Sequence, residues 1–201
     1  MTTTNQHDPD ASARFTALVM PHLDTLLAFS RRRTDSSADA EDAVQDAFLR
    51  AWLGFNELRD PSRVRPWLYR ILRTVLADEH EKRGRRHQIV SITRLEDALE
   101  EVVGGDPDQV FTEVASRMSA DMVHAALASI PEDFAVPVEL HDIDGFKYNE
   151  IADIVGVPIG TVMSRISRGR RLLAGAIATT MPGIQGEKAD TARRGQDGRL
   201  G

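Results

Sequence analysis

Hydrogen-bonding side chains recur at intervals of three and four residues late in the chain. The set is Thr161, Ser164, Ser167, Arg168 and Arg171, with Arg165 at its edge. Because side chains at this spacing share one face of an α-helix, the pattern predicts a helix with one polar, basic side. Arginine can donate two hydrogen bonds to a guanine, and hydroxyls can hold phosphates, so this side suits the major groove of DNA. The alternative is a solvated helix face that binds nothing.

The residues around this face predict a helix-turn-helix over residues 148–173. Ile151, Ala152 and Val155 form the apolar stripe of a first helix, and Gly156 is the type of residue that ends one. Ala152 is small enough to lie where two steeply crossing helices touch. Pro158 suits the first turn of the second helix, whose buried face is predicted to hold Val162, Ile166 and Leu173. This spacing, with four arginines and no acid in the second helix, favours DNA binding over the solvated face.

A second basic region spans residues 63–86, with eight basic residues against three acids. A helix that starts near Pro66 and ends around Gly84 is predicted to bury Trp67, Leu68, Ile71, Leu72, Val75 and Leu76. The polar residues beside this core are Arg63 and Arg65 in the preceding loop, 56–65, and Arg70, Arg73 and Thr74, with Ala77, on the opposite side of the helix. A polar loop beside a basic helix could hold a base extruded from a duplex. A basic cap that only aids solubility is the alternative.

The segment 37–55 predicts a helix, capped by Ser37 or Asp39, with an acidic flank beside exposed leucines. The polar flank is Glu41, Asp42, Gln45 and Asp46, and the leucines are Leu49 and Leu53. An acidic flank with exposed leucines suits docking on a basic helix of a partner. Alternatively, the acids only interact favourably with the dipole at the start of the helix.

Composition excludes several kinds of site. The chain has 201 residues and no cysteine, so it holds neither a disulfide nor a thiolate metal site. No HxxxH, HExxH or Gly-rich phosphate loop occurs, so we expect no metal, no cofactor and no catalytic residues. No apolar run is long enough to span a membrane and the N-terminus lacks the features of a signal peptide, so we expect a soluble, cytoplasmic protein.

The net charge of −6 is distributed unevenly along the chain. Residues 94–113 hold one basic residue against seven acids and lie between the two basic regions. We therefore predict an acidic, flexible linker over 87–118, and disordered tails over 1–10 and 181–201. The other segments predict helices over 11–33, with a kink at Pro21, over 119–130, and over 131–141, which Pro137 kinks or shortens. The predicted fold class is all-α.

Three segments, in this order, resemble the extracytoplasmic-function (ECF) sigma factors of bacterial RNA polymerase. They are DAEDAVQDAFLRAW, RPWLYRILRTVLAD and SIPEDFAVPVELHDIDGFKYNEIADIVGVPIGTVMSRISRGRRLL. The resemblance covers residues 15–86 and 120–173. It implies two small helical domains, sigma region 2 (11–86) and sigma region 4 with the helix-turn-helix (119–178), joined by the linker.

The resemblance also implies a function. An alternative sigma factor of this kind has no catalysis of its own, binds the clamp helices and the flap of core RNA polymerase, and directs transcription initiation at specific promoters. A role in a stress response and control by an anti-sigma factor are implied as well. From the residues alone, a stand-alone helix-turn-helix transcriptional regulator remains the alternative.

Single residues take roles from the resemblance. Those that would face the polymerase clamp are Asp42, Gln45, Asp46 and Leu49. Those that would open and hold the minus-ten element are Asn56, Arg63 and Arg65 in the loop, and Arg70, Arg73, Thr74 and Ala77 on the helix. Minus-35 bases would be met by Met163, Ser164, Ser167 and Arg168, and phosphates by Thr161, Arg165 and Arg171. Many relatives have a basic residue at the position of Met163 and an asparagine at that of Thr74. Trp52 and Trp67 are interpreted as core residues.

Overall fold

The computed structural model describes residues 9–82 and 119–180, and every regular element in these two stretches is a helix. The described residues form two compact units: unit 1 comprises 9–82 and 140–162, and unit 2 comprises 119–139 and 163–180. The predicted all-α fold is confirmed. The linker predicted over 87–118, and the predicted tails apart from residues 9 and 10, lie outside the described residues.

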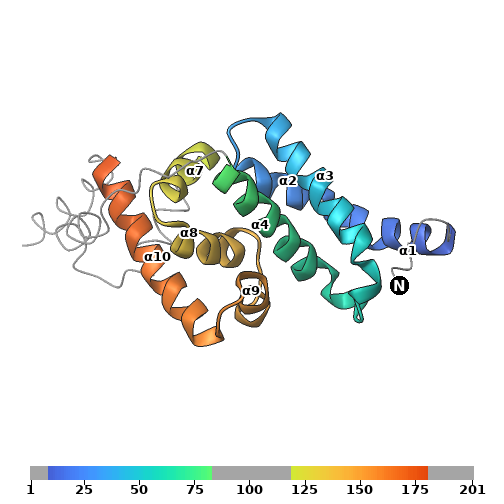
Figure 1. Cartoon of the computed structure of the whole chain (residues 1–201). Helices are drawn as coiled ribbons and strands as arrows, with labels where there is room; N and C mark the ends of the chain where they lie inside the picture. The colour runs from blue at the N-terminus through green and yellow to red at the C-terminus, as the bar shows by residue number, and fades with distance from the viewer. Residues whose placement is uncertain (1–8, 83–118, 181–201) are drawn as a thin grey trace, which may run out of the picture. The chain divides into compact units, whose positions relative to one another are not determined.

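The first predicted helix is interrupted at the expected proline. Helix α1 (Pro9–Val19) and helix α2 (Leu23–Arg31) are separated by one 3-10 turn, Met20–His22, which contains Pro21 (Figure 1). Proline has no backbone N–H to donate to a preceding carbonyl, so it interrupts the regular hydrogen-bond pattern. Leu26 and Phe29 of α2 are fully buried in unit 1.

Helix α3 (Ser37–Leu53) begins one residue after a serine cap. The Ser36 hydroxyl oxygen accepts a hydrogen bond from the Asp39 N–H at 3.1 Å, so Ser36 caps the helix. The predicted cap, Ser37 or Asp39, is wrong. The helix packs against both α2 and α4. Its buried side is made almost entirely of alanine, which allows close helix packing: Ala40, Ala43, Val44, Ala47 and Ala51.

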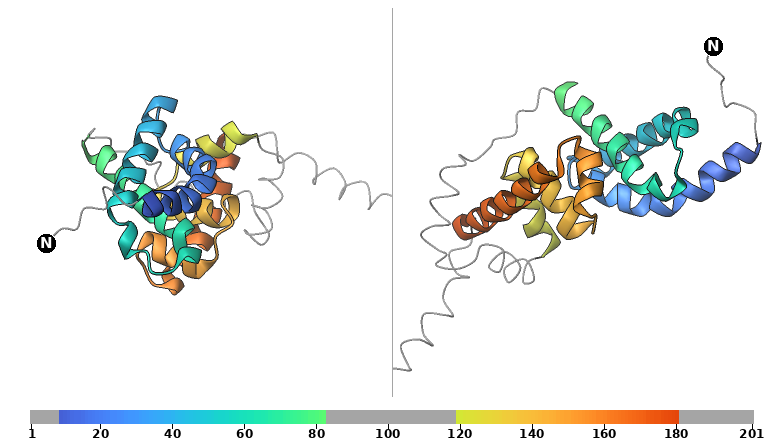
Figure 2. Two further views of the ribbon diagram at one scale, coloured as in Figure 1. Left: turned by 90° about the vertical axis from the view of Figure 1, so that its right-hand side faces the viewer. Right: turned by 90° about the horizontal axis from the view of Figure 1, so that it is seen from below.

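Helix α4 (Val64–Lys82) follows two short 3-10 turns, Phe55–Glu57 and Pro61–Arg63, and packs against α2, α3 and α9 (Figures 1 and 2). Trp67 and Ile71 are predicted to be buried but are only partly so. Tyr69, which the pattern does not single out, is fully buried. The other predicted core residues of this helix are buried, namely Leu68, Leu72, Val75 and Leu76.

Tyr69 is buried because α4 is covered on a second side. Its ring packs edge-on against Phe29 of α2, with the ring centroids 5.1 Å apart, and against Phe146, with the centroids 4.7 Å apart. Phe146 precedes helix α9 (Tyr148–Val155), which belongs to unit 1 and contacts α4. Periodicity within α4 cannot reveal this second cover, since it comes from a segment distant in the sequence.

Unit 2 is built from helix α7 (Ala120–Ala128), helix α8 (Glu132–Val138) and most of helix α10 (Ile159–Thr180). The helix predicted over 131–141 is shortened, as Pro137 predicts, and a π-helical turn, Glu139–Ile143, continues the chain. The large apolar side chains buried in this unit are Leu127, Ile130, Val136, Val138, Ile166, Leu172, Leu173 and Ile177.

Helices α8 and α10 approach each other closely at Gly169. A Cβ atom on this residue would lie 2.6 Å from Val138 Cγ2 and 2.8 Å from the carbonyl oxygen of Phe134. Real Cβ atoms do not come this close to backbone atoms, so any larger residue would have to displace α8. Gly169 therefore positions α10 against α8.

Candidate nucleic-acid interface

The exposed side of α4 carries three of the predicted DNA-contacting residues. Arg70, Thr74 and Ala77 are exposed and follow one another at about one helical turn. The Thr74 hydroxyl donates a hydrogen bond to the Arg70 carbonyl oxygen at 3.1 Å, which holds its side chain against its own helix. Arg70 is thus presented to solvent between the loop 56–65 and Thr74.

Arg73 does not lie on the outward side of α4, where the sequence places it. Its side chain is partly buried, and its Nη1 lies 3.5 Å from the carbonyl oxygen of Val155 in α9. Its Nε is buried without a hydrogen-bond partner. Packing of α9 against α4 covers this position, so the helical periodicity that predicts an exposed Arg73 is overridden by tertiary structure.

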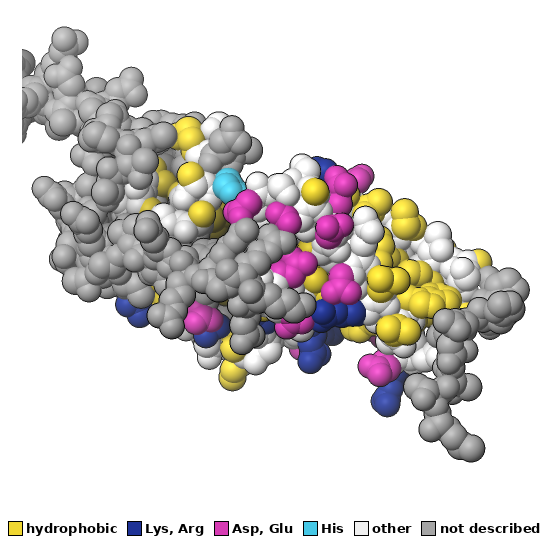
Figure 3. All heavy atoms as spheres, turned by 45° about the horizontal axis from the view of Figure 1, so that its top comes forward, with side chains coloured by type: hydrophobic (Ala, Val, Ile, Leu, Met, Phe, Trp, Pro, Cys, Tyr) yellow, Lys and Arg dark blue, Asp and Glu magenta, His cyan; other side chains and the backbone are white. Residues whose placement is uncertain are grey.

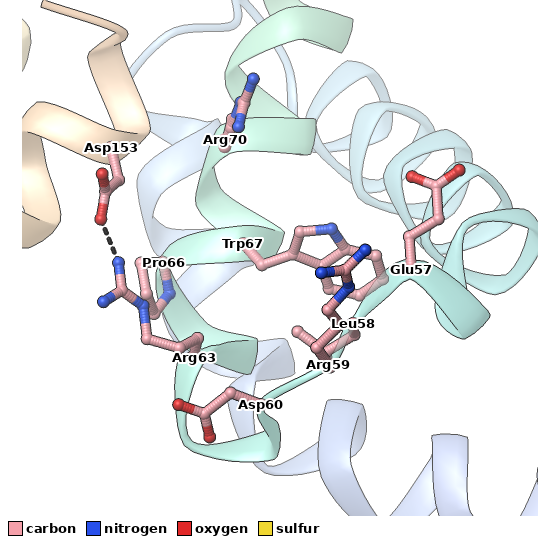
Figure 4. A pocket seen from close by; sticks show the side chains of 9 residues that line it. All are labelled: Glu57, Leu58, Arg59, Asp60, Arg63, Pro66, Trp67, Arg70 and Asp153. Carbon is pink, nitrogen blue, oxygen red and sulfur yellow. Dashed lines mark hydrogen bonds and ion pairs between the residues drawn. The ribbon is translucent and has the colours of Figure 1, made fainter.

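A cavity of about 330 Å³ lies between the loop after α3 and the start of α4 (Figure 4). This is in the range of natural ligand pockets, about 300–1,000 Å³. The indole of Trp67 forms part of the wall. The sequence analysis interprets Trp67 as a core residue, but the structure places it at the edge of this cavity. Aromatic rings and guanidinium groups are surfaces on which unstacked bases pack. The lining residues are Glu57, Leu58, Arg59, Asp60, Arg63, Pro66, Trp67, Arg70 and Asp153.

Asp60 holds the loop beside this cavity in shape. Its carboxylate accepts hydrogen bonds from the Ser62 hydroxyl at 2.8 Å and from the Ser62 N–H at 2.9 Å, which caps the turn Pro61–Arg63. Both hydrogen bonds lower the pKa of Asp60 and so keep it ionised. Asn56, predicted to act with this loop, is exposed on the preceding turn and does not line the cavity.

Two predicted DNA-contacting arginines beside the cavity contact other atoms of unit 1. Arg63 forms an ion pair with Asp153 of α9, drawn as a dashed line in Figure 4. Arg65 donates a hydrogen bond to the carbonyl oxygen of Asp144, and its guanidinium lies 3.9 Å from the centroid of the Phe146 ring. The sequence gives no sign of these acceptors.

The Asp144 carboxylate is itself held by an arginine that directly follows α2. Arg32 Nη2 donates to both carboxylate oxygens, at 3.0 and 3.1 Å, and the two side chains are only 19% and 8% exposed. Burial, and then the nearby Asp144 carboxylate, raise the pKa of the Tyr69 phenol. A buried charge pair thus lies beside the aromatic contact between Tyr69 and Phe146.

The helix, turn and helix predicted over 148–173 are present. At the start of α9, the Glu150 carboxylate accepts a hydrogen bond from the Lys147 N–H at 2.8 Å. Gly156 ends the helix at φ 73°, a left-handed conformation that glycine adopts without strain, and its N–H donates to the Ala152 carbonyl at 2.9 Å. Ala152 is only partly buried, and the buried side chains of α9 are Ile151, Ile154 and Val155.

Helix α10 presents the polar face that its spacing predicts. Met163 is 52% exposed, and Ser164, Ser167, Arg168 and Arg171 are also exposed. Thr161 and Arg165 are partly buried at the margins of this face. The side opposite is formed by the predicted core residues, all of them buried: Val162, Ile166 and Leu173.

Two arginines of α10 are supported by α8 within unit 2. Arg165 Nη1 lies 3.1 Å from a carboxylate oxygen of Asp133. The Arg168 guanidinium lies 5.3 Å from the centroid of the Phe134 ring. These contacts restrict the two long side chains without burying the Arg168 side chain, which remains exposed.

The acidic flank of α3 is exposed, as the sequence predicts. Asp42 and Gln45 are exposed, while Asp46 is partly buried and receives an ion pair from Arg50 at 3.0 Å. Leu49 is 64% exposed. Figure 3 shows acidic and hydrophobic side chains next to one another on one face of the described residues.

Comparisons with known proteins match both basic helices to one family. The model of sigma-70 region 2 matches residues 18–86, and that of sigma-70 region 4 matches residues 120–173. The sigma-E factor of Escherichia coli K12, an ECF RNA polymerase sigma factor, is 32% identical over 144 residues, which cover 68% of this chain and 73% of the relative. This chain belongs to the ECF sigma factors.

Two further comparisons place this ECF sigma factor among its relatives. The ECF factor SigE of Mycolicibacterium smegmatis is 34% identical over 173 residues, and these cover 85% of this chain but 64% of the relative's length. A co-crystal structure of the sigma factor RpoE with the anti-sigma factor NepR from Bartonella quintana is similar with a TM-score of 0.61 and 25% identity. The match covers 82% of this chain and 96% of that one.

Four residues that shape the sites of this sigma factor are missed by the sequence analysis. Asp144 contacts Arg65 and Asp153 contacts Arg63. Asp133 contacts Arg165, and Gly169 sets the packing of α10. Only Gly169 has a local signal, because a glycine inside an amphipathic helix often marks a close approach. The three aspartates show none, since their partners lie far along the chain or on another helix.

The described residues, 9–82 and 119–180, contain no group of three or more histidine or acidic side chains that could hold a metal ion. Over the same residues, no helix of this sigma factor has the length and apolar character needed to cross a membrane.

Proposed function

We propose that this sigma factor binds core RNA polymerase and directs it to promoters through two DNA-contacting surfaces. One consists of α4 with its preceding loop, and the other is the polar face of α10. The observation that carries the proposal is that each matched region presents its own basic, hydrogen-bonding surface. Arg70 and Thr74 are exposed within region 2, and Ser164, Ser167 and Arg168 are exposed within region 4.

The α4 surface is proposed to open and hold the minus-ten element. Arg70, Thr74 and Ala77 would follow the upstream edge of the separated strands, where a guanidinium neutralises phosphate charge. The cavity beside Trp67 would take an extruded base, because it combines an indole with the guanidinium groups of Arg59 and Arg63. Arg65, Arg73 and Asn56 would contribute further contacts to the single strand.

The α10 surface is proposed to read the minus-35 element in the major groove. Ser164, Ser167 and Arg168 would hydrogen-bond base edges, and Met163 would offer an apolar contact of the kind a thymine methyl group accepts. The residues assigned to phosphates lie at the margins of this face, namely Thr161, Arg165 and Arg171.

The exposed α3 surface is proposed to dock on the clamp helices of the polymerase. Asp42, Gln45 and Asp46 supply acidic and polar groups. Leu49 supplies an apolar side chain that is exposed to water in the free chain. Region 4 is proposed to bind the polymerase flap. In this role the chain carries out no reaction of its own and acts in the cytoplasm, where the polymerase works.

Run-off transcription tests the proposed function. Purified chain is added to core RNA polymerase and a library of promoter fragments, and the transcripts are sequenced. We expect new transcripts that share a minus-ten and a minus-35 element. Absence of a complex with core polymerase would refute the proposal, and tight sequence-specific binding to DNA without polymerase would favour a stand-alone regulator instead.

The clamp assignment is tested by Leu49→Glu. Burying a charge at an interface is costly, so affinity for core polymerase is expected to fall by at least tenfold, about 1.4 kcal/mol, in a titration with labelled chain. Met20→Glu is the control, because Met20 is also an exposed apolar residue of unit 1 but lies outside α3. Equal affinities for both variants would remove Leu49 from the interface.

We also propose an anti-sigma partner, since the similar sigma factor RpoE is solved in complex with one. The chain is affinity-purified from its own cells, and co-purifying proteins are added to the run-off reaction. One of them is expected to abolish the promoter-specific transcripts without affecting transcription by another sigma factor. If no co-purifying protein inhibits the reaction, the proposed partner is wrong.

A further inference from the structure

Two large apolar side chains are exposed at the start of α10, next to its polar face. Ile159 is 49% exposed and Met163 is 52% exposed, and they are four residues apart on one helix. Side chains at this spacing lie one above the other on a helix. Ile159 and Met163 therefore form one continuous apolar strip on the surface of α10.

The strip continues into the polar face. Ser167 and Arg171 follow Met163 at the same four-residue interval, and both are exposed. Gly160 lies beside the strip, and a Cβ atom on it would meet no atom within 4 Å, so the space there is open. Residues 159–173 contain no acid that would repel a nucleic acid. The strip is thus part of the surface that α10 presents to DNA in the proposed function.

We propose that Ile159 and Met163 select pyrimidines with a C5 methyl group, which in natural promoters means thymine, within the minus-35 element. The thymine methyl is the apolar group that base edges offer in the major groove, where the other edges offer hydrogen-bond donors and acceptors. An apolar side chain against such a polar edge leaves the edge without a partner, so the strip also disfavours the other bases. The inference rests on the proposed function for the identity of this surface, and it adds Ile159 to the residues that determine base preference.

The spacing of the two side chains fits bases on nearby steps of a duplex. Four residues of α-helix span ~6 Å along the helix axis, and successive bases of one strand are about 3.4 Å apart. In helix-turn-helix proteins, residues near the start of the second helix are those that reach base edges. Ile159 is the first residue of α10, and Met163 lies in its second turn. The strip therefore reaches two thymines that are no more than two steps apart.

A protein partner is the alternative occupant of the strip, because exposed apolar area is also typical of protein interfaces. The continuity of the strip with Ser167 and Arg171, and the absence of acids from residues 159–173, favour DNA. A protein partner would respond to loss of the two apolar side chains, but not to loss of a methyl group from the DNA. Changing the DNA as well as the chain therefore separates the two occupants.

The first test removes single methyl groups from the promoter. Uracil differs from thymine only in lacking the C5 methyl group, so each thymine of the minus-35 element, on either strand, is replaced in turn by uracil. The affinity of the holoenzyme for each template is measured by competition binding. We expect two positions, no more than two steps apart, at which uracil weakens binding about fourfold, the effect of burying one methyl group. An element without thymine on either strand, or one in which uracil changes nothing, would overturn the proposal.

Variants of the chain then identify which side chain meets which methyl group. Met163→Ala is expected to bind thymine and uracil templates equally at one of the two positions, and Ile159→Ala at the other. Both variants should fold, because alanine is a better helix former than either natural residue. Ile143→Ala is the matched control: Ile143 is 45% exposed and lies in the π-helical turn Glu139–Ile143, outside α10. It should keep the full difference at both positions. If Met163→Ala and Ile159→Ala weaken binding to thymine and uracil templates alike, the strip does not read the methyl groups and the proposal is wrong.

Methylated cytosine distinguishes an apolar contact from a hydrogen bond. Cytosine carries an amino group where thymine carries the O4 acceptor, and methylation at C5 restores only the methyl group. At the two positions sensitive to uracil, we expect cytosine to weaken binding and 5-methylcytosine to regain about fourfold. Met163→Ala should gain nothing from the methylation at its own position. No gain in the natural chain would assign the thymine preference to a hydrogen bond with O4, from a hydroxyl such as that of Ser167, and would overturn the proposal.

The largest change in base preference is expected from Met163→Arg. A guanidinium donates two hydrogen bonds to guanine, so this variant should prefer guanine to thymine at the Met163 position by about tenfold, which reverses the natural preference. Met163→Leu keeps an apolar side chain of similar size and should keep the preference for thymine. Binding to a set of templates that differ only at this position measures both. An unchanged preference in Met163→Arg would show that residue 163 does not meet a base.

The outcomes also separate this inference from the proposed function. Promoter-specific transcription by a holoenzyme that binds thymine and uracil templates equally would leave the proposed function intact and refute the selection of thymine. Absence of a complex with core polymerase would refute the proposed function itself, and the inference would be refuted with it, because it names the bases that this surface reads.

Discussion

The two basic surfaces of this sigma factor differ in what their arginines contact. Those around α4 are largely turned to acceptors in the segment 144–155: Arg63 to a carboxylate, and Arg65 and Arg73 to backbone carbonyls. On α10, Arg168 and Arg171 stay exposed. The two regions therefore differ in what holds their arginines: a segment distant in the sequence around α4, and the neighbouring helix α8 on α10. Basic charge in a sequence indicates a potential nucleic-acid surface, and packing decides how much of it is accessible.

This difference between the two surfaces comes from what packs against each helix on the sides away from its polar face. α4 is covered on two sides, since Tyr69 is buried against both Phe29 and Phe146. α10 is supported at Gly169, where α8 approaches its backbone directly. Support from behind leaves the polar face of α10 open, whereas the second cover on α4 brings acceptors alongside its arginines.

Removing the buried charge pair should weaken the α4 side most. In Arg32→Met, the Asp144 carboxylate remains buried and loses two hydrogen bonds, so unit 1 is expected to lose about 3 kcal/mol in free energy of unfolding. Urea denaturation followed by far-ultraviolet circular dichroism measures this. The neighbouring variant Arg31→Met is the control: its ion pair with Glu41 spans 4.0 Å between half-exposed side chains and is worth at most about 0.5 kcal/mol. Similar losses in free energy of unfolding for both variants would show that the Arg32–Asp144 pair stabilises unit 1 no more than an exposed ion pair does.

The support of α10 can be broken at Gly169. A methyl group there would overlap Val138 and the Phe134 carbonyl, and forcing it in is expected to cost about 2 kcal/mol of stability in unit 2 despite the better helix propensity of alanine. Gly160→Ala, on the same helix with nothing within 4 Å of the added Cβ, is expected to be neutral or slightly stabilising. Urea denaturation again measures the effect. A Gly169→Ala chain as stable as Gly160→Ala would mean that α8 moves aside easily.

The buried and exposed sides of α10 are predicted from the sequence more accurately than those of α4. The difference in packing between the two helices explains why. Val162, Ile166 and Leu173 are buried and the polar face is exposed, because helical periodicity alone decides which side of α10 is buried. The kink at Pro21 and the left-handed Gly156 are also local consequences of residue type. All of these follow from interactions within a few residues.

The errors have a common origin in long-range packing. Arg73 is covered by α9, and Tyr69 is buried between Phe29 and Phe146. Trp67 lines a cavity formed with the loop 56–65. The acceptors Asp144 and Asp153 lie more than seventy residues from their arginines, at sequence separations of 79 for Arg65 and 90 for Arg63. A single sequence carries no pattern that pairs residues across such distances. The wrong cap on α3 is a smaller error, because Ser36, Ser37 and Asp39 lie within four residues of one another and each is of a type that caps helices.

Base reading by the α10 face is tested with Arg168→Ala. If Arg168 contacts a base edge, binding of the holoenzyme to its preferred minus-35 element should weaken about tenfold, and much less on a scrambled element. Arg171→Ala is the matched control, assigned to phosphate, and should weaken both templates alike while lowering the salt dependence of binding by about one ion. Electrophoretic mobility shifts over a salt series distinguish the two. Uniform loss on both templates would assign Arg168 to the backbone.

The smallest expected effect concerns a contact of α10 that is of the same kind as those around α4, the pair between Arg165 and Asp133. It spans 3.1 Å and Asp133 is well exposed, so Asp133→Asn should change stability by no more than about 0.5 kcal/mol. Arg165 would then be free to turn to a phosphate, and holoenzyme affinity for promoter DNA should rise about twofold at low salt and not at high salt. Glu132→Gln, the preceding acid on the same helix turn, controls for net charge. A gain in Asp133→Asn that exceeds its control and vanishes with salt would mean that α10, like α4, keeps one of its donors engaged within the chain until DNA competes for it, and that the two surfaces differ in degree. A gain equal to that of the control would mean that the pair with Asp133 does not hold Arg165 back from DNA, and in this respect α10 would differ from α4.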